Sequence, residues 1–232
     1  KSIGGANDDL GYSVSADASG NVFITGFFKS SSITFGSTIL ANIGNVNVFI
    51  AKYDVNGNVL WAKSAVGGTQ FAVGRSVSTD AGGNVFVTGG FNPPNIIFGS
   101  TILTPPVGSS FPMFIVKYDA NGNVLCASVL ASGGNYQSVS ADPFGNAYIG
   151  SEFMATPFIV GATTLTNSGV EDLFVAKYIC CANITPAITG NNLICPGSNA
   201  TLGASGGVTY SWSTGQQGSS VVVSPSSNSI YT

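Results

Sequence analysis

The feature that most constrains the fold is a five-residue motif, Asp-x-x-Gly-Asn, which occurs five times in the first two-thirds of the 232-residue chain. In each copy the Asp side chain can accept backbone N–H groups inside a turn, and the Gly can take the positive φ that a short hairpin loop requires. Each copy therefore predicts a β-hairpin. The residues that we expect to form these structural turns are Asp17, Gly20, Asp54, Gly57, Asp80, Gly83, Asp119, Gly122, Asp142 and Gly145.

The sequence around these turns repeats with a period of about 63 residues, which suits one four- or five-stranded sheet per repeat. Phe-Gly-Ser-Thr-Ile-Leu occurs at 35–40 and again at 98–103, and the stretch 49–54 matches 114–119 and, without its Asp, 174–178. The third copy has no equivalent of 59–62, so we expect its sheet to stop one strand short. The predicted units are 1–7 (the end of a preceding repeat), 8–70, 71–135 and 136–179.

The chain is predicted to be all-β, because no stretch of ten or more residues shows the apolar spacing of a helix and Gly, Ser, Thr, Asn and Val dominate. Several predicted strands are near-continuous apolar runs, which indicates sheets covered on both faces by other sheets. The recurring aromatic residues fit the cores of such sheets better than a ligand platform, since each stands at the same place in its repeat. They are Phe23, Phe49, Phe86, Phe114 and Phe174.

Composition argues against several kinds of partner. Charged residues make up 7% of the chain, against about 25% in an ordinary soluble domain, and the net charge is −3. A nucleic-acid-binding protein would instead carry a basic stripe. No apolar run approaches the length of a membrane span, about 18 residues. We therefore expect no nucleic-acid partner and no membrane span.

Most enzyme classes are excluded because the chain has no histidine. Paired carboxylates remain formally open to it. Glu152, Glu171 and Asp172 depart from the repeat pattern and could form an acidic cluster, but a more exposed edge of the third sheet is the simpler interpretation. We expect no enzyme activity.

No cofactor is expected either. The Asp-x-Asn-Gly-Asn form at Asp54 and Asp119 resembles part of a calcium loop, and these two residues are the alternative calcium candidates. The bidentate Glu that such a loop supplies six residues later is absent. Three lysines, Lys52, Lys117 and Lys177, recur before a Tyr, and we expect their stems to lie along the sheets with the ammonium groups in water.

Several segments of residues 1–179 together resemble the bacterial SBBP β-propeller repeat. They are Ser-Val-Ser-Ala-Asp, Gly-Asn-Val-Phe-Ile-Thr-Gly, Phe-Gly-Ser-Thr and Val-Phe-Ile-Ala-Lys-Tyr-Asp. Residues 180–232 resemble a truncated immunoglobulin-like or PKD-like β-sandwich module, in which Tyr210-Ser211-Trp212 is a candidate core strand. The resemblance implies a secreted, cell-surface protein of the Bacteroidota, exported by type IX secretion, and brings no catalytic residues with it.

The four cysteines, Cys126, Cys180, Cys181 and Cys195, permit three pairings. Adjacent cysteines rarely bond to each other because the ring is strained, which leaves Cys126 with one of the adjacent pair and Cys195 with the other. Such bridges would join the second repeat to the third and the third repeat to the sandwich. This use of cysteine suits an oxidising, extracellular compartment. Zinc is disfavoured because histidine and Cys-x-x-Cys spacing are absent.

We therefore expect a non-catalytic structural or adhesive segment of a large secreted surface protein, as a filament or stalk subunit. The alternative is a ligand-binding propeller that recognises polysaccharide or protein. The variable loops 41–47 and 104–111 are small and apolar, which favours the structural class. Residues 1–5 align with 63–68, so the chain is expected to begin with the last strand of a missing repeat. That segment could complete the third sheet of another copy, which predicts self-association into elongated assemblies.

Overall fold

A computed structural model describes residues 2–67, 71–134, 137–154, 156–180, 187–191, 193–205 and 210–232. All regular structure in these residues is β-strand, which confirms the all-β prediction. The chain divides into two compact units, residues 1–180 and 181–232. The expected division lay one residue earlier. Each unit is described by itself.

The described residues of the first unit form three main antiparallel sheets, one in each predicted repeat, and three small sheets. In each main sheet the strands lie in a simple order, and the first two are joined by an Asp-x-x-Gly-Asn turn. Sheet 1 has the order β1 (Asp9–Ala16), β2 (Val22–Phe28), β5 (Asn47–Tyr53), β6 (Val59–Ser64); sheet 2 has β8 (Ala72–Thr79), β9 (Val85–Phe91), β12 (Pro112–Tyr118), β13 (Val124–Ser132); sheet 3 has β14 (Ser138–Ala141), β15 (Asn146–Phe153), β18 (Asp172–Ile179). Within the described residues sheet 3 has three strands, one fewer than its neighbours.

A small hairpin is inserted between the second and third strands of every main sheet. The first two are built on the repeated Phe-Gly-Ser-Thr segment and the third on its equivalent, Val160-Gly161-Ala162-Thr163. The glycine of each, Gly36, Gly99 or Gly161, has φ of 59°. The hairpins are β3 (Ser32–Phe35) with β4 (Thr38–Ala41), β10 (Ile96–Phe98) with β11 (Thr101–Leu103), and β16 (Phe158–Val160) with β17 (Thr163–Leu165); the short strand β7 (Val66–Gly67) pairs with β10.

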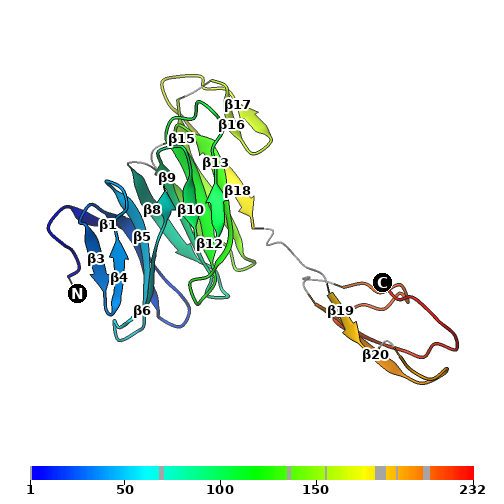
Figure 1. Ribbon diagram of the computed structural model, residues 1–232. Coiled ribbons are helices and arrows are strands. Elements are labelled where there is room, and N and C mark those ends of the chain that lie inside the picture. Colours follow the sequence, from blue (N-terminus) through cyan, green and yellow to red (C-terminus); the bar gives the residue numbers. More distant parts are fainter. Residues whose placement is uncertain are drawn as a thin grey trace. The chain divides into compact units, whose positions relative to one another are not determined.

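The three sheets stack face to face in chain order, as Figure 1 shows, with β8 in contact with β1 on one side and β14 on the other. Side chains from facing sheets fill the space between them. Phe23, Val48 and Ile50 of sheet 1 share a core with sheet 2, and Phe86 and Ile115 of sheet 2 share one with sheet 3. The central strands β9 and β12 are buried throughout, because sheet 2 is covered on both faces.

Residues 2–7, which we expected to behave as the closing strand of a preceding repeat, form no strand. They pack on their own sheet 1: the Gly5 N–H donates to Asp9 Oδ2 (2.6 Å), the Asn7 N–H donates to Ser30 Oγ (3.0 Å), and Ile3 joins a hydrophobic cluster there. The structure therefore gives no support to strand exchange through this segment.

The second unit has one three-stranded sheet, in the order β19 (Ala187–Gly190), β20 (Ala200–Ser205) and β21 (Ser220–Val223). Its core gathers around Trp212, which packs with Val221 and Val223 and donates its indole N–H to Gly218 O at 2.9 Å. Trp212 is thus a core residue. The segment around it makes only an isolated bridge, Ser211 to Gln217, so the Tyr-x-Trp stretch is not the regular strand that we expected.

Candidate functional site

The five Asp-x-x-Gly-Asn turns use their polar side chains internally. In the first, Asp17 Oδ1 accepts the N–H groups of Ser19 (3.0 Å) and Asn21 (2.9 Å), while the Asn21 side-chain amide donates to Asp17 Oδ2 (2.8 Å). The other four turns repeat these contacts, and their glycines have φ between 74° and 84°, the conformation assigned to them from the sequence.

The same turn contacts occur at the two calcium candidates. Asp54 and Asp119 accept N–H bonds from the residues two and four positions later and from an Asn side chain, at 2.7 to 2.9 Å. In the part of the chain that the structure describes, no three acidic, cysteine or histidine side chains form a group able to hold a metal ion. Both carboxylates therefore act as turn caps here.

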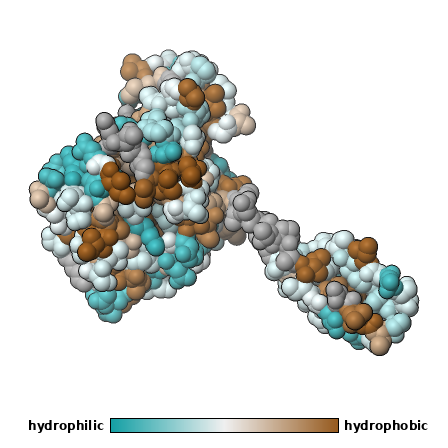
Figure 2. Space-filling view, in the orientation of Figure 1, coloured by the Kyte–Doolittle hydropathy of each residue, from teal (hydrophilic) through white to brown (hydrophobic). Residues whose placement is uncertain are grey.

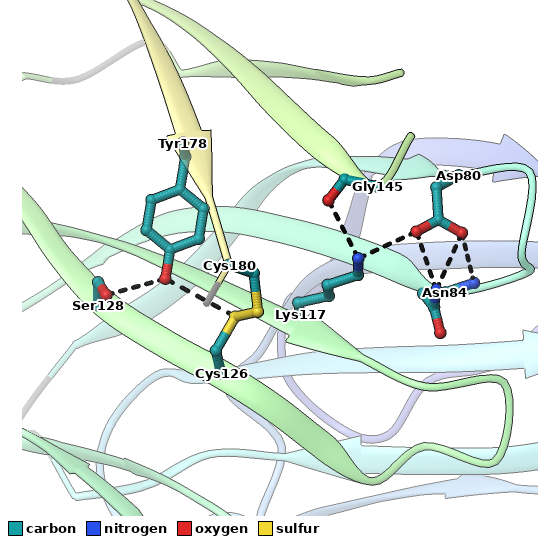
Figure 3. Close-up of a disulfide and its surroundings, with 8 residues drawn as sticks. All are labelled: Asp80, Asn84, Lys117, Cys126, Ser128, Gly145, Tyr178 and Cys180. Carbon is teal, nitrogen blue, oxygen red and sulfur yellow. Dashed lines mark hydrogen bonds and ion pairs between the residues drawn. A yellow bond between two sulfur atoms is a disulfide. The ribbon is translucent and has the colours of Figure 1, made fainter. Parts of the chain in front are cut away.

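Two lysines form an unexpected clamp between sheets. Lys117, only 8% exposed, places Nζ 3.1 Å from Asp80 Oδ2 of its own sheet and donates to Gly145 O of sheet 3 at 3.1 Å (Figure 3). Lys52 lies 3.8 Å from Asp17 Oδ2 and donates to Ala120 O of sheet 2. Our expectation that these ammonium groups lie in water is wrong for both, because the next sheet covers them. Lys177, on the outermost sheet of the described repeat unit, is exposed.

The surroundings of the clamp change the pKa of Asp80, the ion-pair partner of Lys117. Burial alone would raise the pKa of Asp80, but hydrogen bonds from Asn84 and Lys117 and the charge of Lys117 outweigh it, so the pKa lies below its ordinary value. The Lys117 ammonium also lies over the Phe86 ring, 4.7 Å from its centre. The clamp is thus a charged contact whose groups are all satisfied at the junction of two sheets.

Serine side chains make a second repeated contact between sheets. Ser13 Oγ accepts the Val77 N–H (3.1 Å), and one repeat later Ser76 Oγ accepts the Val139 N–H (3.1 Å). Ser78 Oγ accepts the Ala141 N–H in the same way, at 2.9 Å. The first strands of sheets 1 and 2 therefore each bind the first strand of the next sheet through the repeated Ser-Val-Ser segment.

The contact between fourth strands and the next sheet differs between the two interfaces. The Trp61 indole N–H donates to Ala120 O at 3.0 Å between sheets 1 and 2. One repeat later these two positions hold Cys126 and Cys180, which form a disulfide (Figure 3). The expected bridge to Cys195 is not formed: Cys180 is already bonded to Cys126, and Cys195 carries a free, exposed thiol. Cys181 lies outside the described residues.

The acidic residues of the third repeat have different surroundings. Burial and the nearby Glu171 charge raise the pKa of Glu152, and Glu152 Oε1 is buried without a hydrogen-bond partner. The Asp172 carboxylate accepts the Ser168 N–H at 2.7 Å, so it is used to order the loop before β18. Because Glu152 replaces Phe27 and Gly90 of the earlier repeats, it stands on the face of sheet 3 that points away from sheet 2.

The two outermost faces of the stack are the remaining candidate sites. The end face of sheet 3 carries solvent-exposed apolar side chains: Leu173 is 79% and Val175 71% exposed. We define this face by Ser138, Ser140, Tyr148, Leu173, Val175 and Lys177. At the other end, the groove of sheet 1, with a volume of 420 Å³, is lined by Val14, Val22, Ile24, Phe35, Phe49 and Tyr53 among others. Exposed apolar residues also stand among polar ones elsewhere on the repeat unit (Figure 2).

No family model matches the chain. The chain is 30% identical over 186 residues to an uncharacterised WD repeat-containing protein of Acanthamoeba polyphaga mimivirus; the match covers 71% of this chain and 13% of that protein's length. A crystal structure of a protein of unknown function from Bacteroides caccae resembles the chain with a TM-score of 0.37 and 13% identity, covering 83% of this chain and 52% of the other. Within the described residues, no helix is available to cross a membrane.

Proposed function

We propose that the chain is a non-catalytic structural segment of a larger repeat protein, in which sheets of one type stack in series and carry a small β-sandwich module. The single observation that carries this proposal is the use made of the repeated polar residues. The turn aspartates cap turns, the serines join first strands and two of the three lysines clamp neighbouring sheets. Polar groups that recur with the repeat thus maintain the stack.

We further propose that each sheet is a propeller blade of the SBBP type. Propeller blades are typically four-stranded antiparallel sheets packed face to face, and WD repeats form one such class. The four strands of sheets 1 and 2, and a relative whose name contains WD repeats, support that form. The second unit, with its core around Trp212, is proposed as part of an immunoglobulin-like or PKD-like module.

We also propose that the protein works outside the cell, on the surface, as the SBBP resemblance implies for type IX secretion in the Bacteroidota. The disulfide between Cys126 and Cys180 supports an oxidising compartment, since such bonds persist mainly outside the cytosol. An antibody raised against residues 8–180 should then label intact cells of the source organism. Labelling only after permeabilisation would contradict a cell-surface location.

The functional test is a glycan array and an extracellular-protein array probed with the labelled chain. For a structural segment we expect no saturable binding. The alternative, a ligand-binding propeller, predicts saturable binding that is lost when the variable loops are changed, for which Ile43→Asn and Val107→Asn are suitable because both side chains are exposed. Such loop-dependent binding would overturn the structural proposal.

A further inference from the structure

The two interfaces inside the stack are built to one plan. In each, one sheet contributes two serines on its first strand, an aromatic residue on its second and two apolar residues and a lysine on its third. In sheet 1 these are Ser13, Ser15, Phe23, Val48, Ile50 and Lys52; in sheet 2 they are Ser76, Ser78, Phe86, Met113, Ile115 and Lys117. The four aliphatic residues among them are at most 3% exposed, and both phenylalanines are fully buried.

Sheet 3 presents the same set outward. Its repeat equivalents are the residues of the end face: Ser138, Ser140, Tyr148, Leu173, Val175 and Lys177. The two apolar positions that are at most 3% exposed inside the stack are 79% and 71% exposed here. Within the described repeat unit, the end face of sheet 3 is therefore the uncovered counterpart of the two internal interfaces.

The groove of sheet 1 is the complementary half. Inside the stack, the surface of sheet 2 that receives Phe23, Val48 and Ile50 is formed by Val77, Val85, Val87, Phe98, Phe114 and Tyr118, all in one core cluster with them. The repeat equivalents of those six in sheet 1 are Val14, Val22, Ile24, Phe35, Phe49 and Tyr53. All six line the groove. Val14 is 66% exposed where Val77 is 5% exposed, so the groove is an unfilled copy of the internal surface.

We infer that the stack binds a second copy of this chain head to tail, with the end face of sheet 3 of one copy seated in the groove of sheet 1 of the next. We take the occupant to be a second copy because both halves of the internal interface are uncovered within the described repeat unit, one on each of its two outermost faces. Tyr148, Leu173 and Val175 take the places of Phe23, Val48 and Ile50. The inference deepens the proposed structural function and rests on it, and it needs no exchange of residues 2–7.

The internal contacts also give the polar register of this joint. Ser138 Oγ corresponds to Ser76 Oγ, so its partner is the N–H of Val14, the equivalent of Val139. Lys177 corresponds to Lys52, whose acceptor is Ala120 O, and the equivalent of Ala120 in sheet 1 is Val55, which lines the groove. The two ends are different surfaces, so the contact is heterologous and can propagate.

The test uses the full chain with one change at each end. Val14→Glu places a charge in the groove and Val175→Glu places one on the end face; both side chains are exposed, so folding should be retained. Ile39→Glu is the matched control, because Ile39 is 68% exposed on β4 and is outside the groove. Mass is measured by analytical ultracentrifugation from about 1 to about 100 µM, the range in which a micromolar contact forms and dissociates. Thermal melting confirms that each variant is folded.

The wild-type chain and the Ile39→Glu variant should grow in mass with concentration beyond the 23.5 kDa monomer, while each end variant alone stays monomeric. An equal mixture of the two end variants should form a heterodimer and stop there, because it retains one intact end face and one intact groove. A monomeric wild type, self-association of either end variant, or a mixture without heterodimer would overturn the inference.

A small apolar ligand is the other possible occupant of the groove. If the wild type stays monomeric and binds the dye ANS in a way that Val14→Glu abolishes, the groove is a ligand site and the second copy is excluded. These outcomes are independent of the array experiment above. A monomer that binds no glycan would overturn only the head-to-tail contact, whereas loop-dependent glycan binding would overturn the proposed function.

Discussion

Gly89 should tolerate no side chain, because a β-bulge brings another backbone onto it. The register of β8 on β9 shifts between Gly74 and Ser76, and this shift aims Val73 O at Gly89. A Cβ at residue 89 would lie 1.9 Å from that oxygen and 2.6 Å from Cζ of Phe114. Gly26, one repeat earlier, faces Leu10 O across the same bulge at the same 1.9 Å.

The cost of Gly89→Ala follows from these contacts. The obstacle is backbone on one side and a fully buried ring on the other, so the upper part of the range for overpacking applies, about 3 kcal/mol. Replacing Gly by Ala restricts the unfolded chain and returns about 1 kcal/mol. The net loss of about 2 kcal/mol corresponds to a fall of about 4–8 °C in the melting temperature of a unit of this size.

Differential scanning calorimetry of Gly89→Ala beside Gly150→Ala tests this reasoning. Gly150 belongs to the third repeat, where a Cβ would meet nothing within 4 Å, so the control should melt at or slightly above the wild-type temperature. Equal melting temperatures for Gly89→Ala and the wild type would show that the bulge relaxes freely, and the argument from close approach would then fail.

Three further perturbations test the clamp, its titration and the disulfide. Lys117→Met leaves the buried Asp80 carboxylate without its cation and should cost about 3 kcal/mol in urea unfolding, against about 0.5 or less for the exposed Lys177→Met; equal costs would contradict a buried clamp. Because the folded pKa of Asp80 is depressed, its contribution is complete above the unfolded pKa of about 3.9 and is lost as the pH falls through the folded value, so the melting temperature should drop in acid, and less so in Asp80→Asn. Cys126→Ser opens a bridge that spans 54 residues and should destabilise the chain by about 2–4 kcal/mol under oxidising conditions, whereas Cys195→Ser should have no effect; the reverse order would contradict the assigned pairing.

The local structure was largely predictable because the signals are local. A turn Asp and a Gly with positive φ define each long hairpin within five residues, and each small hairpin comes from one repeated segment with a positive-φ Gly at its turn. The absence of an equivalent to residues 59–62 predicts the three strands that sheet 3 has within the described residues.

Contacts between sheets were predicted less well, because they depend on which face a residue shares. Lys52 was expected in water, yet strand alternation puts it on the same side as Val48 and Ile50, which are core residues. The alternation of side chains along the strand can be read from the sequence, and it would have placed Lys52 at the interface. The partner of its ammonium group, Ala120 O, could not have been found, since it lies on a turn 68 residues away.

The cysteines show the same limit. Eliminating a bond between adjacent cysteines narrowed the partner of Cys126 to Cys180 or Cys181. It also assigned a disulfide to Cys195, which is a free thiol in the structure. A signal that chooses between them was present in the repeat. Cys126 and Cys180 occupy the positions of Trp61 and Ala120, and that earlier pair is already in contact. Superposing the repeats on each other therefore carries more information than cysteine counting.

The disulfide determines how tension travels along the chain. A pull applied from the C-terminal side enters the repeat unit at Cys180 and crosses directly to Cys126, because the covalent bond is the shortest path between them. Residues 127–179, which include the whole of sheet 3, then form a slack loop that bears none of the force. The pull acts instead on sheets 1 and 2, so under oxidising conditions the third sheet stays folded until its neighbours have been pulled apart.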